Sequence, residues 1–250
     1  MQAGFVSLEV DDSEMKAYVS VPDGSGPFPA VVLAQHASGV DEFMRFACET
    51  LSDAGFAAVA PDLYHRQEDD ITFEEIVAIK RGDPRRDQII PVKMSGLRDD
   101  EMVRDMNTAM IHLQSLDRVS DRAGVTGFCM GGRVAYLMAT RNARLRAASC
   151  FYPGGPFESK GGGPSPFAAS DRINCPIQAF SGNDDMNPSP ADMTKIDSEL
   201  NRLRVPHEFH AYDGAAHAFM DHTNAGAYRQ NAAEDAWLRL IEFFSRHLRS

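Results

Sequence analysis

The sequence lacks the features of membrane, secreted and metal-binding proteins. It has no apolar run long enough to span a bilayer, and no basic start followed by an apolar block, so we expect neither membrane insertion nor a secretory signal. The chain has only four cysteines and no C-x-x-C pair, which favours free thiols in a cytoplasmic protein: Cys48, Cys129, Cys150 and Cys175. Cys and His also lack the paired spacing of a zinc site, so no metal is expected.

Positive charge is also scarce. Lys and Arg number 25 against 36 Asp and Glu, which leaves a formal net charge of −11. This balance argues against a nucleic-acid partner, because phosphates demand a basic face. It does not restrict the charge of a small substrate, since a cleft can differ in sign from the whole surface.

Length and patterning predict one α/β domain over residues 1–250. Residues 6–10 and 17–21 read as a hairpin, and short apolar runs typical of buried strands recur at 30–34, 57–60, 124–126, 147–152, 177–181 and 208–212. Amphipathic helical stretches alternate with them at 42–54, 99–116, 130–140, 190–203 and 227–248. The alternation predicts a mainly parallel sheet with helices on both faces.

Residues 66–98 interrupt this alternation. The segment is charged, has weak periodicity and contains Gly82, Pro84 and Pro91. We expect an excursion over the carboxyl edge of the sheet, with one short helix near 73–80. It is either a lid over a site or a solvated surface insertion.

The most specific motif is Gly127-Phe128-Cys129-Met130-Gly131-Gly132, between a predicted strand and a predicted helix. In a G-x-nucleophile-x-G turn the nucleophile occupies a strained conformation above the sheet, and nearby side chains would collide with it. The helix N-terminus favours a thiolate there, and the Met130 N–H is directed to where an oxyanion would form. We therefore predict that Cys129 is a nucleophile.

A thiol nucleophile needs a base, and a base needs an acid that orients it. His217 is the best-placed histidine because it follows the strand at 208–212 and precedes the last helix, although His36 and His65 also follow strands. For the acid, we choose Asp184 in a Gly-x-Asp-x-x-x-Pro register, with Asp185 as the alternative. The second oxyanion donor is expected from the loop after the strand at 30–34, where we choose the N–H of Ala37.

These residues resemble the dienelactone hydrolase family of α/β-hydrolases. The matching stretches run from about the third strand nearly to the C-terminus: Ala34-Gln35 with Gly39-Val40, Phe43-Met44-Arg45, the run from Ala57 to Tyr64, the cysteine turn at 127–132, Gly182-Asn183-Asp184 with Pro188, and Tyr212 through His217-Ala218-Phe219. The resemblance implies a sheet of about eight strands, a Cys-Asp-His triad and no cofactor. It also implies hydrolysis of small esters or lactones.

Two positions depart from the family pattern. Members of the family carry a glutamate, which takes part in controlling the thiol, where this chain has His36. They carry an arginine that helps to hold the substrate carboxylate where this chain has Asp221. An acid in place of that arginine argues against binding an anionic dienelactone at this position. His36 either pairs with the thiolate or substrate, or forms a hydrogen bond with a neighbouring loop and only fills the space of the glutamate.

Other residues are expected to line a substrate pocket because they follow strands. These are Tyr64, His65 and Tyr152, for which ordinary packing is an equal interpretation, and Arg81 resembles a second carboxylate-binding arginine of the family. The predicted function is hydrolysis of small esters or lactones through a thioester, by a monomer or homodimer. Alternatives are the same triad acting on thioesters or phosphotriesters, or a ligand-binding protein without activity.

Overall fold

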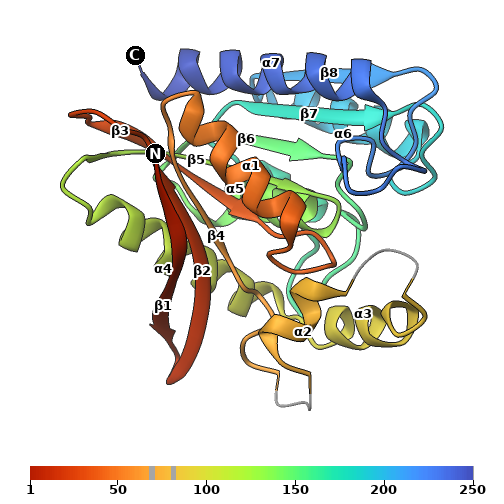
Figure 1. The fold of residues 1–250 in the computed structure, drawn as a ribbon. Helices are drawn as coiled ribbons and strands as arrows, with labels where there is room; N and C mark the ends of the chain where they lie inside the picture. The colour runs from red at the N-terminus through yellow and green to blue at the C-terminus, as the bar shows by residue number, and fades with distance from the viewer. Residues whose placement is uncertain (68–70, 80–82, 250) are drawn as a thin grey trace.

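An eight-stranded sheet forms the centre of the protein. The structure, a computed structural model, describes residues 1–67, 71–79 and 83–249, and its strand order is β1-β2-β4-β3-β5-β6-β7-β8 (Figure 1). The hairpin of β1 and β2 is antiparallel and pairs antiparallel with β4, whereas all other neighbours are parallel. The strands are β1 (Gln2–Val10), β2 (Ser13–Val21), β3 (Phe28–Ala34), β4 (Ala57–Pro61), β5 (Val119–Phe128), β6 (Leu145–Phe151), β7 (Ile177–Gly182) and β8 (His207–Tyr212).

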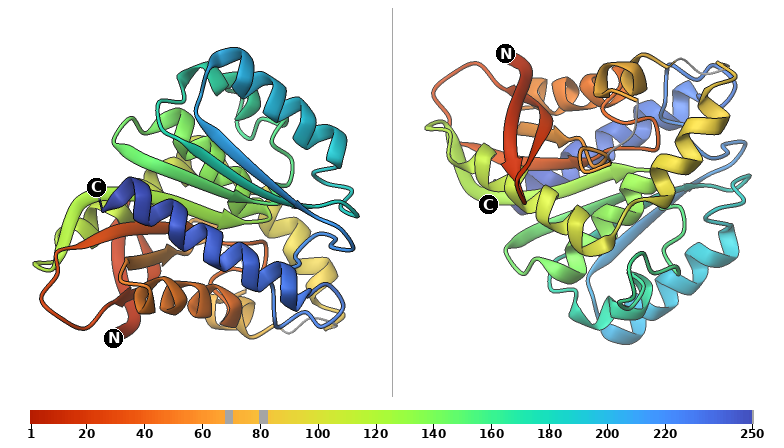
Figure 2. Two further views of the ribbon diagram at one scale, coloured as in Figure 1. Left: turned by 90° about the horizontal axis from the view of Figure 1, so that it is seen from above. Right: turned by 90° about the horizontal axis from the view of Figure 1, so that it is seen from below.

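Five long helices cover the two faces of the sheet, as the sequence pattern predicts. One apolar cluster joins the sheet to α4, α5 and α6, and a second joins it to α1 and α7. Figure 2 shows the same two layers from above and below. The bounds are α1 (Glu42–Asp53), α4 (Asp99–Gln114), α5 (Met130–Arg141), α6 (Pro190–Leu203) and α7 (Gln230–Leu248). The predicted α/β fold with a mainly parallel sheet is confirmed.

The charged insertion holds more structure than the sequence pattern suggests. The expected short helix is α2 (Phe73–Ala78), which begins with a capping box formed by Thr72 and Glu75. A second helix, α3 (Arg86–Ser95), was not expected, and only Ile90 and Lys93 of it are buried. A helix that buries so little shows no apolar stripe, which is why periodicity does not reveal it. Figure 1 shows α2 and α3 next to each other at the lower right.

The insertion lies against the loop that follows β3. A Cβ atom built on Gly39 would lie 2.9 Å from the Ile76 side chain of α2, and Arg86 of α3 donates to the Ser38 hydroxyl at 2.5 Å. Because β3 is a parallel strand, its following loop lies at the carboxyl edge of the sheet. Described residues of the insertion therefore contact the carboxyl edge of the sheet, and its role as a lid stays a prediction.

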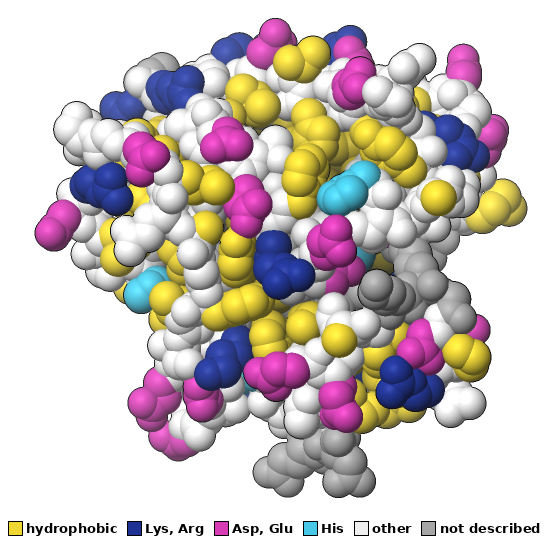
Figure 3. All heavy atoms as spheres, viewed as in Figure 1, with side chains coloured by type: hydrophobic (Ala, Val, Ile, Leu, Met, Phe, Trp, Pro, Cys, Tyr) yellow, Lys and Arg dark blue, Asp and Glu magenta, His cyan; other side chains and the backbone are white. Residues whose placement is uncertain are grey.

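The surface carries charges of both signs. Figure 3 shows Lys and Arg side chains interspersed with Asp and Glu on one face, with hydrophobic side chains between them. Among the described residues, no helix combines the length and apolar character needed to cross a membrane. Within the same ranges, no group of three or more His, Cys, Asp or Glu side chains is arranged to hold a metal ion.

A row of phenylalanines crosses the carboxyl ends of three neighbouring strands. Phe128, Phe151 and Phe180 are register partners on β5, β6 and β7. The rings of Phe151 and Phe180 stack with centroids 4.4 Å apart, and those of Phe128 and Phe151 lie 4.7 Å apart. These fully buried rings fix the spacing of the strand ends, from which the loops of the site depart.

Replacing Phe151 by alanine should therefore destabilise the fold strongly. The ring is completely buried between two others, so we expect a loss of about 3–5 kcal/mol in the free energy of unfolding. Urea denaturation measures this loss. The control Leu238→Ala removes a side chain that is 64% exposed and should change the free energy by less than about 0.5 kcal/mol. Equal effects of the two variants would contradict the role of the aromatic row.

Candidate active site

Cys129 sits at the tight turn between β5 and α5. Its backbone has φ of +58° and ψ of −120°, and it is the residue immediately before the helix. Such a conformation costs of order 1–3 kcal/mol for a residue other than glycine, so the surrounding structure must enforce it. The Cys129 N–H donates to the Phe151 carbonyl at 3.0 Å, and the Cys129 carbonyl accepts from Arg133 and Gly154.

Glycines on both sides of the turn allow backbone to touch backbone. A Cβ atom on Gly127 would lie 2.2 Å from the carbonyl oxygen of Gly131, and one on Gly131 would lie 2.0 Å from that of Ala34. Neither contact can be relieved by moving a side chain. The requirement for glycine at these positions, inferred from the sequence, therefore has a direct structural cause.

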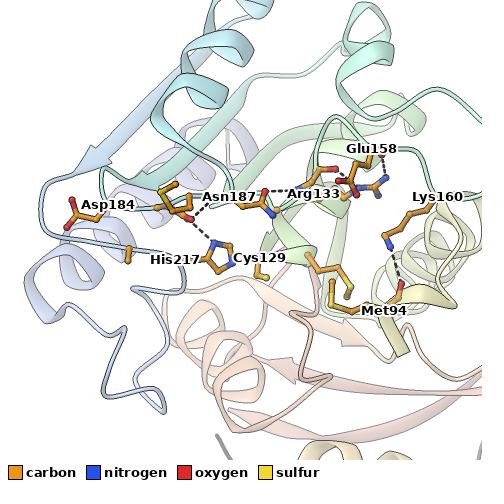
Figure 4. Close-up of a pocket in the computed structure, with 14 residues that line it drawn as sticks. Met94, Cys129, Arg133, Glu158, Lys160, Asp184, Asn187 and His217 are labelled. Carbon is orange, nitrogen blue, oxygen red and sulfur yellow. Dashed lines mark hydrogen bonds and ion pairs between the residues drawn. The ribbon is translucent and has the colours of Figure 1, made fainter. Parts of the chain in front are cut away.

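His217 comes from the loop after β8 and reaches Cys129 from the side. Figure 4 shows the imidazole pointing toward the Cys129 thiol. Its Nδ1 lies 2.8 Å from Oδ2 of Asp185, and the ring packs edge-on against Tyr152 with centroids 5.0 Å apart. The carboxylate and the aromatic ring together hold one orientation of the imidazole, with Nε2 left for the thiol.

The choice of Asp184 as the acid is corrected by this geometry. Asp184 is exposed, whereas the buried Asp185 contacts His217 through Oδ2 and accepts the Asn187 N–H through Oδ1 at 2.8 Å. Two backbone hydrogen bonds hold the turn after β7. The Asp184 N–H donates to the Ala215 carbonyl, and the Asp185 N–H donates to the Gly182 carbonyl. This turn directs the second aspartate inward, a difference of one residue that composition and spacing do not reveal.

The thiol and the imidazole shift each other's titration. Burial raises the pKa of the Cys129 thiol, but hydrogen bonding and charge from His217, the charge of His36 and the Met130 N–H outweigh it, so the thiol pKa is lowered overall. Burial lowers the pKa of His217, but Asp185 and Cys129 outweigh it and raise that pKa to about 10. The two groups therefore favour a thiolate beside an imidazolium.

The loop after β3 is held from two directions. The Tyr64 hydroxyl donates to the Ala37 carbonyl at 3.0 Å, and the Arg86 guanidinium donates to the Ser38 hydroxyl. The Met130 N–H interacts with the Cys129 sulfur, and its role as an oxyanion donor stays a prediction. For Ala37, the role of its N–H stays a prediction.

A cavity of about 480 Å³ opens beside Cys129 and His217. Its walls come from the turn between β5 and α5, the first turn of α5, the loops after β6, β7 and β8, and α3. Four residues predicted from the sequence line it: Cys129, Met130, Asp184 and His217. Asp185, the alternative acid, also lines it. The remaining lining residues were not predicted as site residues: Met94, Arg133, Gly154, Gly155, Glu158, Lys160, Met186, Asn187 and Ala216.

Arg133 holds the wall of this cavity together from behind. Its side chain is almost fully buried and pairs with both carboxylate oxygens of Asp99, at 2.6 and 3.1 Å. It also donates to the carbonyls of Gly155 and Glu158. An arginine within an otherwise apolar helix is a sequence signal for such a role, because a buried guanidinium needs partners.

The other predicted pocket residues do not line this cavity. His36, Tyr64 and Tyr152 are buried, so they act on the site through neighbouring groups: Tyr64 holds the loop at Ala37, and Tyr152 packs on His217. His65 lies apart in a polar network. Arg81 falls outside the described residues.

His65 belongs to an arrangement that resembles a second triad. Its Nδ1 lies 3.0 Å from the Ser13 hydroxyl and its Nε2 lies 3.2 Å from Asp105. The Arg66 guanidinium also meets Nε2, at 2.8 Å, and bonds to Asp105. These contacts tie the hairpin of β1 and β2 to α4.

Comparison with known proteins decides the family. The model of the dienelactone hydrolase family matches residues 15–248. The chain belongs to this family. A relative from Synechocystis sp., named "Putative carboxymethylenebutenolidase", is 29% identical over 249 residues, which cover 98% of this chain and 96% of the relative. One of the same name from Escherichia coli is 30% identical, covering 98% and 87%.

Solved structures agree with this assignment. A structure described as a dienelactone hydrolase from Klebsiella pneumoniae superposes with a TM-score of 0.85 at 27% identity, covering 98% of both chains. A dienelactone hydrolase-like promiscuous phosphotriesterase from metagenomic libraries superposes with a TM-score of 0.78 at 22% identity, covering 98% of both chains, and shows the shared fold. The protein is thus a hydrolase of the dienelactone hydrolase family in the α/β-hydrolase superfamily.

The two departures from the dienelactone hydrolase pattern are electrostatically coupled. His36 is buried, with Nε2 2.9 Å from the Asp41 carboxylate. Burial lowers the pKa of His36, but Asp41, Asp221 and Cys129 outweigh it and raise that pKa. The acid at 221 therefore supports a positive charge at 36, and this charge in turn lowers the thiol pKa. The contact with Asp41 is also the bond to a neighbouring loop that the second interpretation of His36 expects, so its role toward the thiol or substrate stays a prediction.

The lowered thiol pKa predicts the alkylation profile of Cys129. Iodoacetamide reacts with the thiolate, so the rate at Cys129 should reach half of its maximum below pH 9.0, the usual thiol value. Mass spectrometry of the Cys129 peptide measures the rate. The other three cysteines are internal controls, because burial raises their pKa values, that of Cys175 to about 12.

The variant Asp185→Asn sharpens this measurement. Without the carboxylate, the imidazolium loses its main support, and the half-maximal pH should move up toward 9.0. If the half-maximal pH of the wild-type protein were already that of an ordinary thiol, the thiolate–imidazolium pair would be refuted.

Proposed function

We propose that this protein hydrolyses small carboxylic esters or lactones with Cys129 as nucleophile, His217 as base and acid, and Asp185 as the group that orients His217. The observation that carries the proposal is the hydrogen-bonded series of Asp185, His217 and Cys129 at the wall of one cavity. A nucleophile beside a base that is oriented by a third group has the arrangement of a catalytic triad.

In the first half of the reaction the Cys129 sulfur adds to the carbonyl carbon. The carbonyl oxygen becomes an oxyanion, held by the N–H groups of Met130 and Ala37. When the intermediate collapses, the ester C–O bond breaks and the His217 imidazolium protonates the leaving alkoxide. A thioester with Cys129 remains, and a lactone leaves its alcohol attached to the acyl chain.

In the second half, neutral His217 takes a proton from water as the hydroxyl adds to the thioester carbon. The C–S bond then breaks, the product leaves as a carboxylic acid that gives its proton to bulk water, and Cys129 is again a thiolate beside imidazolium. Asp185 stays ionised and holds the ring through Nδ1. These steps use side chains and N–H groups of this chain, together with water.

The names of relatives support a lactone or ester substrate. A relative from Bradyrhizobium sp., 26% identical and covering 98% of this chain, is named "Probable 2-oxo-3-(5-oxofuran-2-ylidene)propanoate lactonase". The relatives named for carboxymethylenebutenolidase activity point to the same bond type. The cavity volume also suits a small substrate, since ligand sites commonly span about 300–1,000 Å³.

Replacing Cys129 by alanine should abolish turnover of 4-nitrophenyl acetate. Without the sulfur no thioester forms, so we expect kcat to fall by at least about 10³-fold. Release of 4-nitrophenol gives the rate. The control is Cys175→Ala, a thiol that precedes β7 at the opposite edge of the sheet and should leave the rate within a factor of two or so. Comparable activity of Cys129→Ala and wild type would reject the proposed nucleophile.

The two neighbouring aspartates provide a matched pair of variants. Asp185→Asn removes the charge that orients His217, so kcat should fall by about 10³–10⁴-fold, as in other triads. Asp184→Asn changes an exposed carboxylate in the same turn and should cost less than about tenfold. The same ester assay compares them. If Asp184→Asn proved the more damaging, the assignment of the acid would be reversed.

A further inference from the structure

The cavity extends well past the reacting atoms to a lysine. Figure 4 shows Asp184 and Lys160 at opposite ends of the lining, with Cys129 between them. Lys160 belongs to the loop after β6, and its ammonium donates to the Met94 carbonyl of α3 at 3.0 Å. The cavity therefore has a cationic group on the side away from Asp184.

Apart from the imidazolium of His217, which pairs with Asp185 and Cys129, the other basic side chain in the wall is already neutralised. Arg133 is buried against the Asp99 carboxylate, and its remaining N–H groups meet the Gly155 and Glu158 carbonyls. A substrate could recruit it only by breaking a buried ion pair, which is strongly unfavourable because it leaves a charge buried without its partner. Lys160 is therefore the cation of this wall that can bind a ligand.

The position of Lys160 is fixed by its own backbone. Its N–H donates to Asp99 at 2.9 Å, and its carbonyl accepts the Asp99 N–H at 2.7 Å. The side chain is half-buried, and within the described part of the chain no carboxylate forms an ion pair with it. An ammonium has three N–H donors, and Met94 uses one. Burial and the nearby Arg133 lower the pKa of Lys160, and a bound anion would oppose this lowering by favouring the charged ammonium.

We propose that Lys160 determines substrate specificity by binding a carboxylate, carried by the ester or lactone substrate, at the end of the cavity opposite Asp184. This inference rests on the proposed function. It places the anion site on the β6 and α3 side of Cys129, whereas position 221 of this chain is a buried acid. Glu158, an exposed carboxylate in the same wall, opposes the anion and moderates the preference.

The test compares a charged and a neutral ester of similar size. Mono-4-nitrophenyl glutarate carries a free carboxylate, and its methyl ester does not. The measured quantity is the ratio of kcat/KM for the charged ester to that for the neutral ester. Wild type should give a ratio above one. Lys160→Met should lower the ratio about 10- to 100-fold, the usual effect of losing one hydrogen bond to a charged group, and Lys160→Arg should restore most of it.

Two further variants separate local binding from overall charge. Glu158→Gln should raise the ratio, because it removes the opposing carboxylate. Lys195→Met is the matched control, since Lys195 on α6 stacks over Phe157 and Phe167 and does not line the cavity. It should leave the ratio unchanged. A wild-type ratio of one or less, or equal ratios for Lys160→Met, Lys195→Met and wild type, would overturn the proposal.

A readout without turnover keeps this inference separate from the proposed hydrolysis. Glutarate bound at Lys160 should slow the alkylation of Cys129 by iodoacetamide in wild type, and less so in Lys160→Met. If neither ester is hydrolysed but this protection is seen, the proposed reaction fails and the anion site stands. Equal protection in both proteins, or none, would overturn the site.

Discussion

The contact between the first turn of α5 and the ends of β3 and β5 is the constraint on which the site depends. Gly127 and Gly131 let backbone meet backbone there, so no side chain separates the helix from the sheet. The chain can turn so sharply only if Cys129 adopts a positive φ, and the surrounding strands supply the bonds that hold it. One packing requirement therefore places the thiol at a helix N-terminus and at the edge of the cavity, where its ionised form is favoured.

The remaining groups reach this thiol from separate loops, and electrostatics couples them. Asp185 raises the pKa of His217, His217 lowers the pKa of the Cys129 thiol, and the charged form of His36, from the loop after β3, lowers the thiol pKa further. Behind them, the buried pair of Arg133 and Asp99 carries the cavity wall and leaves Lys160 as its available cation. The proposed chemistry depends on charged groups near the thiol that interact with one another in series. The proposed specificity depends on Lys160, which forms no ion pair with a carboxylate within the described residues.

Much of the fold could be predicted because the strands are buried on both faces and the long helices have one apolar face. α3 was not predicted because it buries only Ile90 and Lys93, so its sequence shows no apolar face. The acid was misplaced by one residue for a related reason. Both aspartates follow β7, and the turn hydrogen bonds to Gly182 and Ala215 select the one that faces inward. Contacts between loops distant in sequence leave no periodic signal.

The sequence by itself determined the architecture and the sharp turn that carries Cys129, because alternation of apolar segments and the glycine pattern around Cys129 are local consequences of packing. It also predicted His217 as a site residue from its place after the last strand. Only the tertiary structure decided which aspartate meets His217, that Tyr64 and Tyr152 support the site from behind rather than line it, and that Lys160 shares the cavity with Cys129. These relationships join residues that are far apart in the chain, and they arise from how the loops at the carboxyl edge of the sheet pack together.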